Sequence, residues 1–294
     1  MERIAFIGLG EAGQTIGRGL LAQGARLCAY DVLFDDPANK GRLKKAAEGL
    51  GISVSRNHAA AVAEADIVFL AVTASSSLAA AKSCVPGLRK GQFFLDINSV
   101  SPQRKIESAA LVAPTGAAFV DVAVMAPVAP YDHKVPCLIG GPGAEALLPR
   151  ARALGMKMEF VSAEVGQASA IKMFRSIMIK GLEALVVESM VAASEYKVEE
   201  RVLASLKETF PSLDWEKLAG YMLERVISHG KRRASEMREV AETLKGIGMD
   251  PLMAAATAAR QQWVADLGVK ENLKGRKTEN RAELVLAIRK AMGK

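Results

Sequence analysis

One stretch near the N-terminus constrains the fold of this chain more than any other feature. The apolar run Arg3-Ile4-Ala5-Phe6-Ile7 leads straight into Gly8-Leu9-Gly10-Glu11-Ala12-Gly13, and a helical pattern follows. A second strand-like run, Arg26–Asp31, ends in an acidic residue roughly 20 residues after the glycines. A glycine-rich turn between a buried strand and a helix, followed at this distance by an acid, is typical of the βαβ unit that binds dinucleotides.

The first half of the chain continues the alternation of short apolar runs and helical stretches. Several runs are continuously apolar, as expected of parallel strands that are covered on both faces. Helical segments such as 14–23 and 102–111 separate them, which predicts an α/β fold with a doubly wound, mainly parallel Rossmann sheet. Strands are expected at residues 3–7, 26–31, 67–72, 93–97, 119–124, 137–139 and 159–161.

The pattern changes after Val161, and from Gly166 onward only helical periodicity is found. Turn-forming segments around Pro211, between Gly246 and Pro251, and after Gly268 separate the helices. The sequence therefore predicts a Rossmann domain over residues 1–162 and an all-helical domain for substrate and subunit contacts over residues 163–294. Helices are expected in the second domain at residues 167–196, 215–247, 252–267 and 282–292.

Composition argues against several classes of function. The net charge is +7, but the segment Lys270–Lys294, with eight basic and three acidic residues, accounts for +5 of it, so no nucleic-acid surface is expected. The longest uncharged stretch, Ile67–Ala81, is too short and too polar to cross a membrane. Three cysteines without a Cys-x-x-Cys pair suggest core residues in a reducing compartment, and a cytoplasmic protein without a metal site is predicted.

The glycine turn suits a dinucleotide for physical reasons. Gly8 permits the tight turn, Gly10 lets the backbone approach a pyrophosphate, and Gly13 lets helix and strand pack closely. The carboxylate of Asp31 accepts hydrogen bonds from the ribose hydroxyls of NAD and repels the additional phosphate of NADP, which favours NAD. NADP stays possible because Arg26 and Lys40 are near in sequence. The residues expected to bind the cofactor are Gly8, Leu9, Gly10, Glu11, Ala12, Gly13, Asp31, Val72, Thr73, Asn98 and Ser99.

Two other interpretations of this region stay open. A glycine-rich turn can occur without any nucleotide, and a methyltransferase uses a similar fold. Residues further along the chain argue against both.

Four segments carry a family resemblance that covers essentially the whole chain: Ile7-Gly8-Leu9-Gly10-Glu11-Ala12-Gly13; Asp96-Ile97-Asn98-Ser99-Val100-Ser101-Pro102; Phe119-Val120-Asp121-Val122-Ala123-Val124-Met125-Ala126-Pro127; and Gly166-Gln167-Ala168-Ser169-Ala170-Ile171-Lys172. With them the chain resembles the β-hydroxyacid dehydrogenase family, which includes 3-hydroxyisobutyrate dehydrogenase and, more distantly, 6-phosphogluconate dehydrogenase. The resemblance implies that Lys172 is the catalytic acid/base, that Asn98 and Ser99 lie near the nicotinamide, and that the protein is a homodimer or homotetramer.

A lysine suits this chemistry, because oxidation of an alcohol needs a group that accepts the hydroxyl proton as hydride leaves carbon. A partly buried lysine has a lowered pKa, and in its protonated form it stabilises a developing alkoxide. From spacing alone, Lys172 could equally be a surface lysine near a helix start.

The substrate half departs from the family. The usual Ser-Gly-Gly turn is Met125-Ala126-Pro127 here, and the asparagine that normally follows the lysine by four residues is Ser176, preceded by Arg175. Methionine offers no hydroxyl and proline no N–H, so the standard small hydroxy acid is in doubt.

A polar stripe on the second domain is a candidate replacement for these contacts. It comprises Arg225, His229, Arg232, Arg233 and Glu236, and its arginines suit a carboxylate or phosphate. The alternative is a solvated helix face with internal Arg–Glu pairs. The residues expected to contact substrate are Met125, Ala126, Arg175, Ser176, His229, Arg233 and Glu236. His133 is expected in a solvent-facing turn.

These features predict an NAD(P)-dependent oxidoreductase that transfers a hydride between the nicotinamide and a hydroxyl or carbonyl of a small polar or anionic substrate. Two alternatives stay open. One is an imine reductase on the same scaffold, although imine reductases related to this family generally lack the lysine. The other is a non-catalytic NAD-binding protein.

Overall fold

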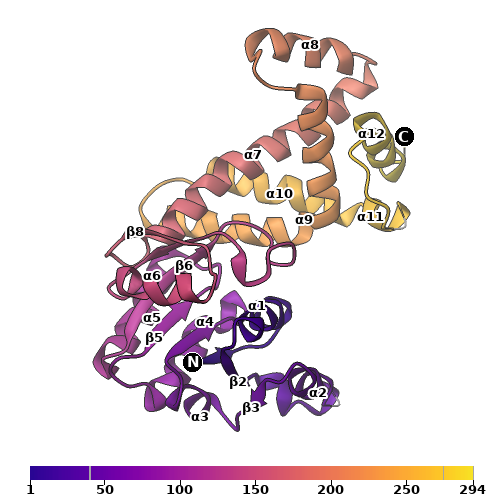
Figure 1. Cartoon of the computed structure of the whole chain (residues 1–294). Coiled ribbons are helices and arrows are strands. Elements are labelled where there is room, and N and C mark those ends of the chain that lie inside the picture. The colour runs from indigo at the N-terminus through magenta and orange to yellow at the C-terminus, as the bar shows by residue number, and fades with distance from the viewer. Residues whose placement is uncertain (40, 274, 294) are drawn as a thin grey trace. The chain divides into compact units, whose positions relative to one another are not determined.

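The strands of the N-terminal half form one twisted sheet in the order β3-β2-β1-β4-β5-β6-β7-β8 (Figure 1). Neighbouring strands run parallel except β6 and β7, which are antiparallel. The strands are β1 (Arg3–Ile7), β2 (Arg26–Tyr30), β3 (Ser53–Val54), β4 (Ile67–Leu70), β5 (Phe93–Asp96), β6 (Ala118–Val124), β7 (Cys137–Gly140) and β8 (Met158–Ser162). The order reverses between β1 and β4, which is the switch point at which open α/β sheets bind ligands.

The computed structural model describes residues 1–39, 41–273 and 275–293. The chain divides into two compact units, Met1–Lys172 and Met173–Lys294. The helices of the first unit are α1 (Glu11–Ala22), α2 (Arg42–Gly49), α3 (His58–Ala63), α4 (Ser77–Cys84), α5 (Pro102–Val112) and α6 (Ala144–Ala153). The long helix α7 (Gln167–Glu195) begins in the first unit and continues into the second.

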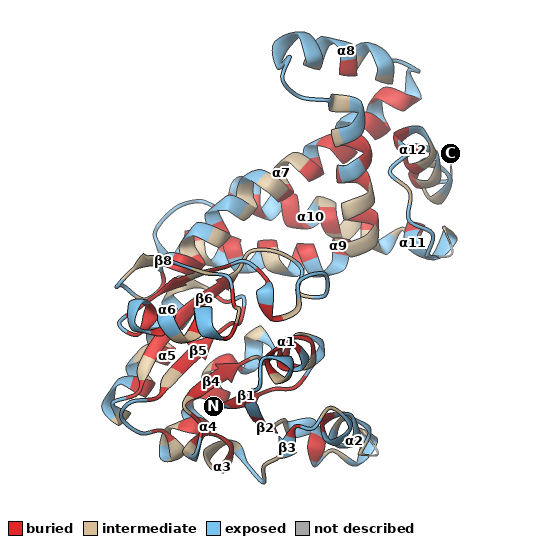
Figure 2. Cartoon of the chain, in the orientation of Figure 1, coloured by how far each residue is buried: buried red, intermediate tan, exposed pale blue. Residues whose placement is uncertain are grey.

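Both faces of the sheet are covered, which explains why the central strands are continuously apolar. Ile4 and Phe6 of β1 belong to a core on one face, whereas Ala5 and Ile7 belong to a second core on the other. Helices α1, α2 and α6 contribute to the first core, and α3, α4 and α5 contribute to the second. β4 is buried along its whole length (Figure 2). Alternate side chains of a strand point to opposite faces, so a strand between two cores needs apolar residues throughout.

The second unit is helical over its described residues. One core includes Val187 of α7, Leu223 of α9 and Ile288 of α12, and a smaller core gathers around Met237 and Val240. Its helices, after α7, are α8 (Glu199–Thr209), α9 (Trp215–Gly246), α10 (Leu252–Asp266), α11 (Val269–Asn272) and α12 (Arg281–Ala291).

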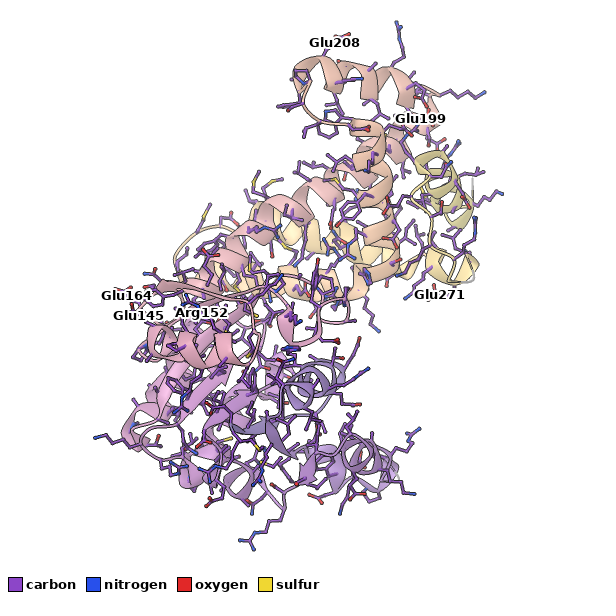
Figure 3. The ribbon with its side chains drawn as sticks, viewed as in Figure 1. Glu145, Arg152, Glu164, Glu199, Glu208 and Glu271 are labelled. Carbon is purple, nitrogen blue, oxygen red and sulfur yellow. The ribbon has the colours of Figure 1, made fainter. Side chains whose placement is uncertain are left out.

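Both units carry exposed polar side chains. Glu145 and Arg152 of α6 and Glu208 of α8 are exposed and point outward (Figure 3). No helix in the described residues is both long enough and apolar enough to cross a membrane. Burial raises the pKa of the Cys84 and Cys137 thiols to about 12, so at neutral pH both behave as small apolar groups.

The predicted fold class is confirmed, and the seven predicted strands are present with ends that differ by one or two residues. The strand β3 and the helices α8 and α11 were not predicted. β3 and α11, with two and four residues, are too short to produce a periodic signal. The predicted division at residue 162 precedes the observed division by ten residues. The start of α7 belongs to the first unit because Asp121 of β6 accepts hydrogen bonds from it.

His133 corrects one expectation, since it is buried rather than solvent-facing. Its ring packs against Gly19 of α1, where a Cβ would collide with the imidazole. Neither ring nitrogen has a hydrogen-bond partner among the described residues. Burial is the main cause that lowers the pKa of His133, and Lys134 lowers it further while Asp132 acts in the opposite direction. The loop that follows β6 therefore packs against α1 through the neutral imidazole of His133.

This geometry predicts an acid-sensitive stability. Because the folded-state pKa of His133 lies below the ordinary value of about 6.5, the unfolded chain binds the proton first as the pH falls. The contribution is complete above about pH 6.5 and is lost progressively below it. We expect the slope of unfolding free energy against pH, measured by urea denaturation from pH 7.5 to 5, to be smaller in His133→Leu than in the wild type. The difference in slope should correspond to up to about one proton fewer taken up on unfolding. An unchanged slope would contradict this role.

Candidate active site

The glycine turn between β1 and α1 is closely packed at Gly8 and leaves room for a phosphate at Gly10. Gly8 has φ +88°, its N–H donates to Tyr30 O at 2.9 Å, and a Cβ there would lie 2.4 Å from Ala71 O. At Gly10, by contrast, a Cβ would meet nothing within 4 Å, and this residue caps α1 while exposed to solvent. The first amides of a helix have no partner within the helix. The turn therefore presents N–H groups to an open space, which is what a pyrophosphate requires.

Asp31 lies at the carboxyl end of β2 and is tied to this turn. Its Oδ2 accepts from Leu9 N–H at 2.7 Å and its Oδ1 accepts from Leu33 N–H at 2.9 Å. Each carboxylate oxygen keeps a second lone pair, so the side chain can also accept from ribose hydroxyls. Arg26 stands at the opposite end of β2, about five residues and about 16 Å of strand away, and cannot reach a ribose phosphate there. Lys40 lies outside the described residues.

Other predicted cofactor residues follow neighbouring strands at the same edge of the sheet. Val72 follows β4, and its side chain lies beside Gly8. Thr73 is exposed, and its hydroxyl hydrogen-bonds to Ser75 and Ser76. The structure thus brings Gly8, Asp31, Val72 and Thr73 to the carboxyl edge near the switch point, where a dinucleotide binds in such folds. Glu11, which is exposed, and Ala12, which is half-buried, stand in the first turn of α1.

Lys172, the predicted acid/base, contacts the turn that follows β5 at this edge of the sheet. Lys172 Nζ donates to Ser99 Oγ at 2.7 Å, although the two residues are 73 positions apart. Asn98 is buried, and both its N–H and its side-chain amide donate to Asp96 Oδ1, at 2.9 and 2.8 Å. Lys172 itself is half-buried, and Ser99 is exposed. An amine and a hydroxyl are therefore held together at the carboxyl end of β5.

The turn that follows β6 offers few hydrogen-bond donors. Met125 N–H donates to Pro136 O at 2.9 Å, so it is already engaged within the protein. Met125 and Ala126 are half-buried, and Pro127 is exposed. This turn therefore lacks both the hydroxyl and one of the N–H groups that would hold a carboxylate.

In the second unit, most of the polar stripe on α9 is paired internally. Arg233 is buried, and its guanidinium forms two hydrogen bonds to Glu183, one of 2.8 Å. Glu236 accepts from Lys180 Nζ at 2.6 Å and from Arg232 at 2.8 Å. This arrangement is the internal Arg–Glu pairing that the sequence left open, and it favours a structural role for Arg232 and Arg233.

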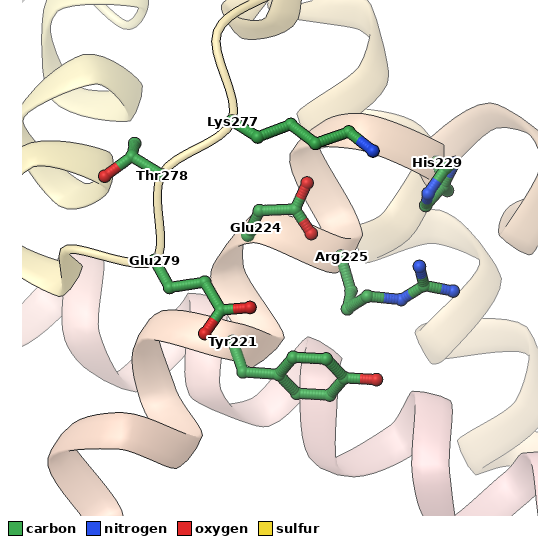
Figure 4. Close-up of a pocket in the computed structure, with 7 residues that line it drawn as sticks. All are labelled: Tyr221, Glu224, Arg225, His229, Lys277, Thr278 and Glu279. Carbon is green, nitrogen blue, oxygen red and sulfur yellow. The ribbon is translucent and has the colours of Figure 1, made fainter. Parts of the chain in front are cut away.

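His229 and Arg225 lie elsewhere, in a pocket of about 420 Å³ (Figure 4). The pocket is also lined by Tyr221, Glu224, Lys277, Thr278 and Glu279. Burial chiefly lowers the pKa of His229, and the nearby Arg225 and Arg232 lower it further. The pocket is thus lined by two cations, Arg225 and Lys277, and two carboxylates, Glu224 and Glu279, so neither sign of charge dominates. Arg175 on α7 is exposed, and Ser176 is half-buried.

Several polar residues of the site were not selected from the sequence. Lys105, Asp96, Asp121 and Ser169 form a buried group beneath Ser99 and Lys172. The available signal was an acidic residue within or at the end of an apolar strand, as at Asp121 and Asp96, because charged residues are seldom fully buried unless they are paired. In the second unit, Lys180 is also buried, and desolvation lowers its pKa against the opposing effect of Glu236. Among the described residues, no group of His, Cys, Asp or Glu could hold a metal ion.

A glycine-turn Rossmann unit joined to a helical unit defines the class of nicotinamide-dependent oxidoreductases. Residues 3–99 match the family described as NADP oxidoreductase, coenzyme F420-dependent, and residues 193–264 match a domain of unknown function, DUF1932. The first match identifies an NAD(P)-binding domain, which confirms the predicted cofactor class.

Two solved structures resemble nearly the whole chain. A conserved hypothetical protein from Sinorhizobium meliloti 1021 is 41% identical, with a TM-score of 0.85 over 99% of this chain and 97% of that protein. The conserved protein MTH1747, reported to resemble 3-hydroxyacid dehydrogenases structurally, is 28% identical, with a TM-score of 0.77 over 90% of this chain and 97% of that protein. The chain belongs to the family of the Sinorhizobium protein.

More distant structures share the fold. The 3-hydroxyisobutyrate dehydrogenase of Mycobacterium tuberculosis is 18% identical, with a TM-score of 0.69 over 99% of both chains. An imine reductase from Streptomyces aurantiacus has the same fold at 14% identity. The protein thus has an NAD(P)-dependent oxidoreductase fold related to hydroxyacid dehydrogenases and imine reductases, and the predicted family resemblance is confirmed.

The position of Asp31 predicts a preference for NADH over NADPH. Replacing its carboxylate in Asp31→Asn keeps an acceptor for one backbone N–H and removes the negative charge that repels a ribose phosphate. We expect the Kd ratio of NADPH to NADH to fall at least tenfold, as measured by quenching of protein fluorescence. Asp36→Asn, an exchange in the loop that follows β2, serves as the matched control. A wild-type protein that binds NADPH more tightly would contradict the assignment.

Proposed function

We propose that this protein is an NAD(P)-dependent dehydrogenase that acts on the CH–OH group of a small polar or anionic, hydroxy-acid-like substrate. The observation that carries the proposal is the 2.7 Å hydrogen bond between Lys172 Nζ and Ser99 Oγ. It sets a titratable amine at the sheet edge that carries the glycine turn and Asp31. Parallel sheets bind their ligands at this edge.

The dinucleotide fits the residues that are present. The space beside Gly10, at the start of α1, is open, and Asp31 offers acceptors for a ribose. When bound, the nicotinamide exchanges a hydride with the substrate carbon. Asn98, fixed by two hydrogen bonds to Asp96, is proposed to orient the ring or its ribose.

Lys172 is proposed to move the proton. During oxidation its neutral amine accepts the hydroxyl proton of the substrate, and during reduction the ammonium returns it to the forming hydroxyl. In the ammonium form it also stabilises negative charge on the substrate oxygen. Ser99 Oγ accepts from Nζ, so it holds the amine in place at the sheet edge.

The substrate side is proposed to use different contacts from the family pattern. Met125 and Ala126 would shape the pocket as apolar surface, because the turn lacks donors. Ser176 follows Lys172 by four residues on one continuous helix, so both lie on the same helix face. Ser176 and Arg175 are therefore proposed to bind the polar or anionic end of the substrate. For His229, Arg233 and Glu236, a substrate role stays a prediction, and the internal pairing of Arg233 and Glu236 weakens it for those two.

A panel of small hydroxy acids, amines with ketones, and both cofactors distinguishes the candidate functions. Turnover of hydroxy acids supports the proposal, turnover of imines supports a reductase of that kind, and cofactor binding without turnover supports a sensor or scaffold. The presence of Lys172 favours the first outcome, because reduction of an imine carbon needs no lysine partner for an alkoxide.

Lys172→Ala tests the assigned acid/base. With the best substrate of the panel we expect turnover to fall by about 10²–10⁴-fold, since a positioned proton-transfer group contributes that much. The Kd of NADH should stay within twofold, because the lysine is not part of the glycine turn. Lys82→Ala, an exchange of an exposed lysine on α4 of the same unit, should leave both unchanged. Full turnover by Lys172→Ala would refute the assignment.

A homodimer or homotetramer is proposed from the surface of α7. Phe174, Met178 and Leu185 are 40%, 65% and 55% exposed, and their spacing places them on one side of the helix. An exposed apolar stripe of this kind marks a subunit contact.

Size-exclusion chromatography with light scattering tests the oligomer. We expect the wild-type mass to be two or four times 31.2 kDa, and the double variant Met178→Glu/Leu185→Glu to elute as a monomer. Arg201→Glu, which alters an exposed residue of α8, is the control. A monomeric wild-type protein at micromolar concentration would overturn this proposal.

A further inference from the structure

A fully buried ion cluster lies between β5, β6 and α5. Lys105, Asp96 and Asp121 each have 0% of their surface exposed. Lys105 Nζ lies 3.0 Å from Asp96 Oδ1 and 3.5 Å from Asp121 Oδ1, and it also donates to the backbone oxygen of Asp96 at 2.5 Å. One ammonium thus bridges Asp96, at the carboxyl end of β5, and Asp121, in the middle of β6.

The Asp96 side of the cluster leads to the turn that carries Ser99. Asp96 Oδ1 accepts from the backbone N–H and from the side-chain amide of Asn98, at 2.9 and 2.8 Å. These two bonds fix the direction in which the chain leaves β5. Ser99 is the next residue, so the position of its hydroxyl depends on this turn.

The Asp121 side leads to the helix that carries Lys172. Asp121 Oδ2 accepts from Gly166 N–H at 3.1 Å and from Ser169 N–H at 3.0 Å, and its Oδ1 accepts from Ser169 Oγ at 2.6 Å. Gly166 has no side chain that could cap α7, so a carboxylate from β6 supplies the cap instead. Ser169 precedes Lys172 by three residues, which is one turn of the helix.

The charges of this cluster depend on one another. Two buried carboxylates and one ammonium leave a net charge of −1, and the positive end of the α7 dipole faces Asp121. Asp96 Oδ2 has no partner among the described residues, so the remaining contacts of Asp96 carry its stabilisation. Removing one member of a buried ion pair leaves an uncompensated charge. If Lys105 loses its charge, both carboxylates lose the cation that holds them together.

We propose that Lys105 is a positioning residue that keeps Lys172 in register with Ser99. A closed ring of contacts runs from Ser99 through Asn98 and Asp96 to Lys105, and from there through Asp121 and Ser169 to Lys172, whose amine returns to Ser99. Lys105 joins the two halves of this ring without touching either the cofactor site or the substrate. The effect on turnover rests on the proposed function, whereas the coupling of the two segments does not.

Amide hydrogen exchange of the full-length protein tests the coupling without any substrate. Lys105→Met approximately keeps the length of the side chain and removes its charge. In this variant we expect the amide of Asn98 and the amide of Ser169 each to exchange at least tenfold faster than in the wild type, after correction for global stability. The matched control is Gln92→Leu, which removes buried hydrogen bonds to Val62 and Ala65 at the other end of β5 and should leave both amides within twofold. Faster exchange confined to α5 would overturn the proposal.

A milder variant covers the case in which Lys105→Met does not fold. Ser169→Ala removes only the hydroxyl contact to Asp121, and the coupling predicts faster exchange at Asn98 as well, by about threefold. An effect confined to residues 166–172 would refute the ring. With an active substrate, Lys105→Met should lower kcat at least tenfold, which is more than it changes KM for NADH. A lowered affinity for NADH with unchanged kcat would contradict the positioning role, whereas absence of turnover in the wild type bears on the proposed function alone.

Discussion

Two carboxylates that are buried on neighbouring strands cannot remain without compensation, and this constraint organises the candidate active site. Asp96 ends β5 and Asp121 lies in the middle of β6, and both are withdrawn from water. Lys105 and the first amides of α7 supply the positive charge. Because these groups also fix a turn and a helix start, satisfying the buried charge brings Ser99 and Lys172 together.

The cofactor half of the site could be predicted from the sequence because its determinants are local. Gly8, Gly10 and Asp31 act through one turn, one helix start and one strand end, and each has a characteristic residue type at a characteristic distance. The parallel sheet then sets these positions at one edge. Lys172 required the family resemblance, since its spacing alone also describes a surface lysine.

Other residues could not be predicted because their partners are far away in the chain. Lys105 resembles any lysine in the first turn of a helix until the sheet brings Asp121 to it, 16 positions later. Arg233 pairs with Glu183, 50 residues earlier, and the stripe on α9 gives no sign of which arginine faces the core. His133 was expected at the surface because a polar loop sequence does not reveal the slot that Gly19 forms in a helix.

The distance between Lys172 Nζ and the substrate oxygen in a bound complex decides whether this lysine can transfer the proton. A crystal structure of the protein with NAD and a substrate from the panel should place Lys172 Nζ within about 3.2 Å of the substrate oxygen, the reach required for proton transfer. The same structure should show the pyrophosphate at the amides after Gly8. A complex in which this amine points into bulk solvent, away from the nicotinamide, would contradict the proposed chemistry and leave only a nucleotide-binding protein.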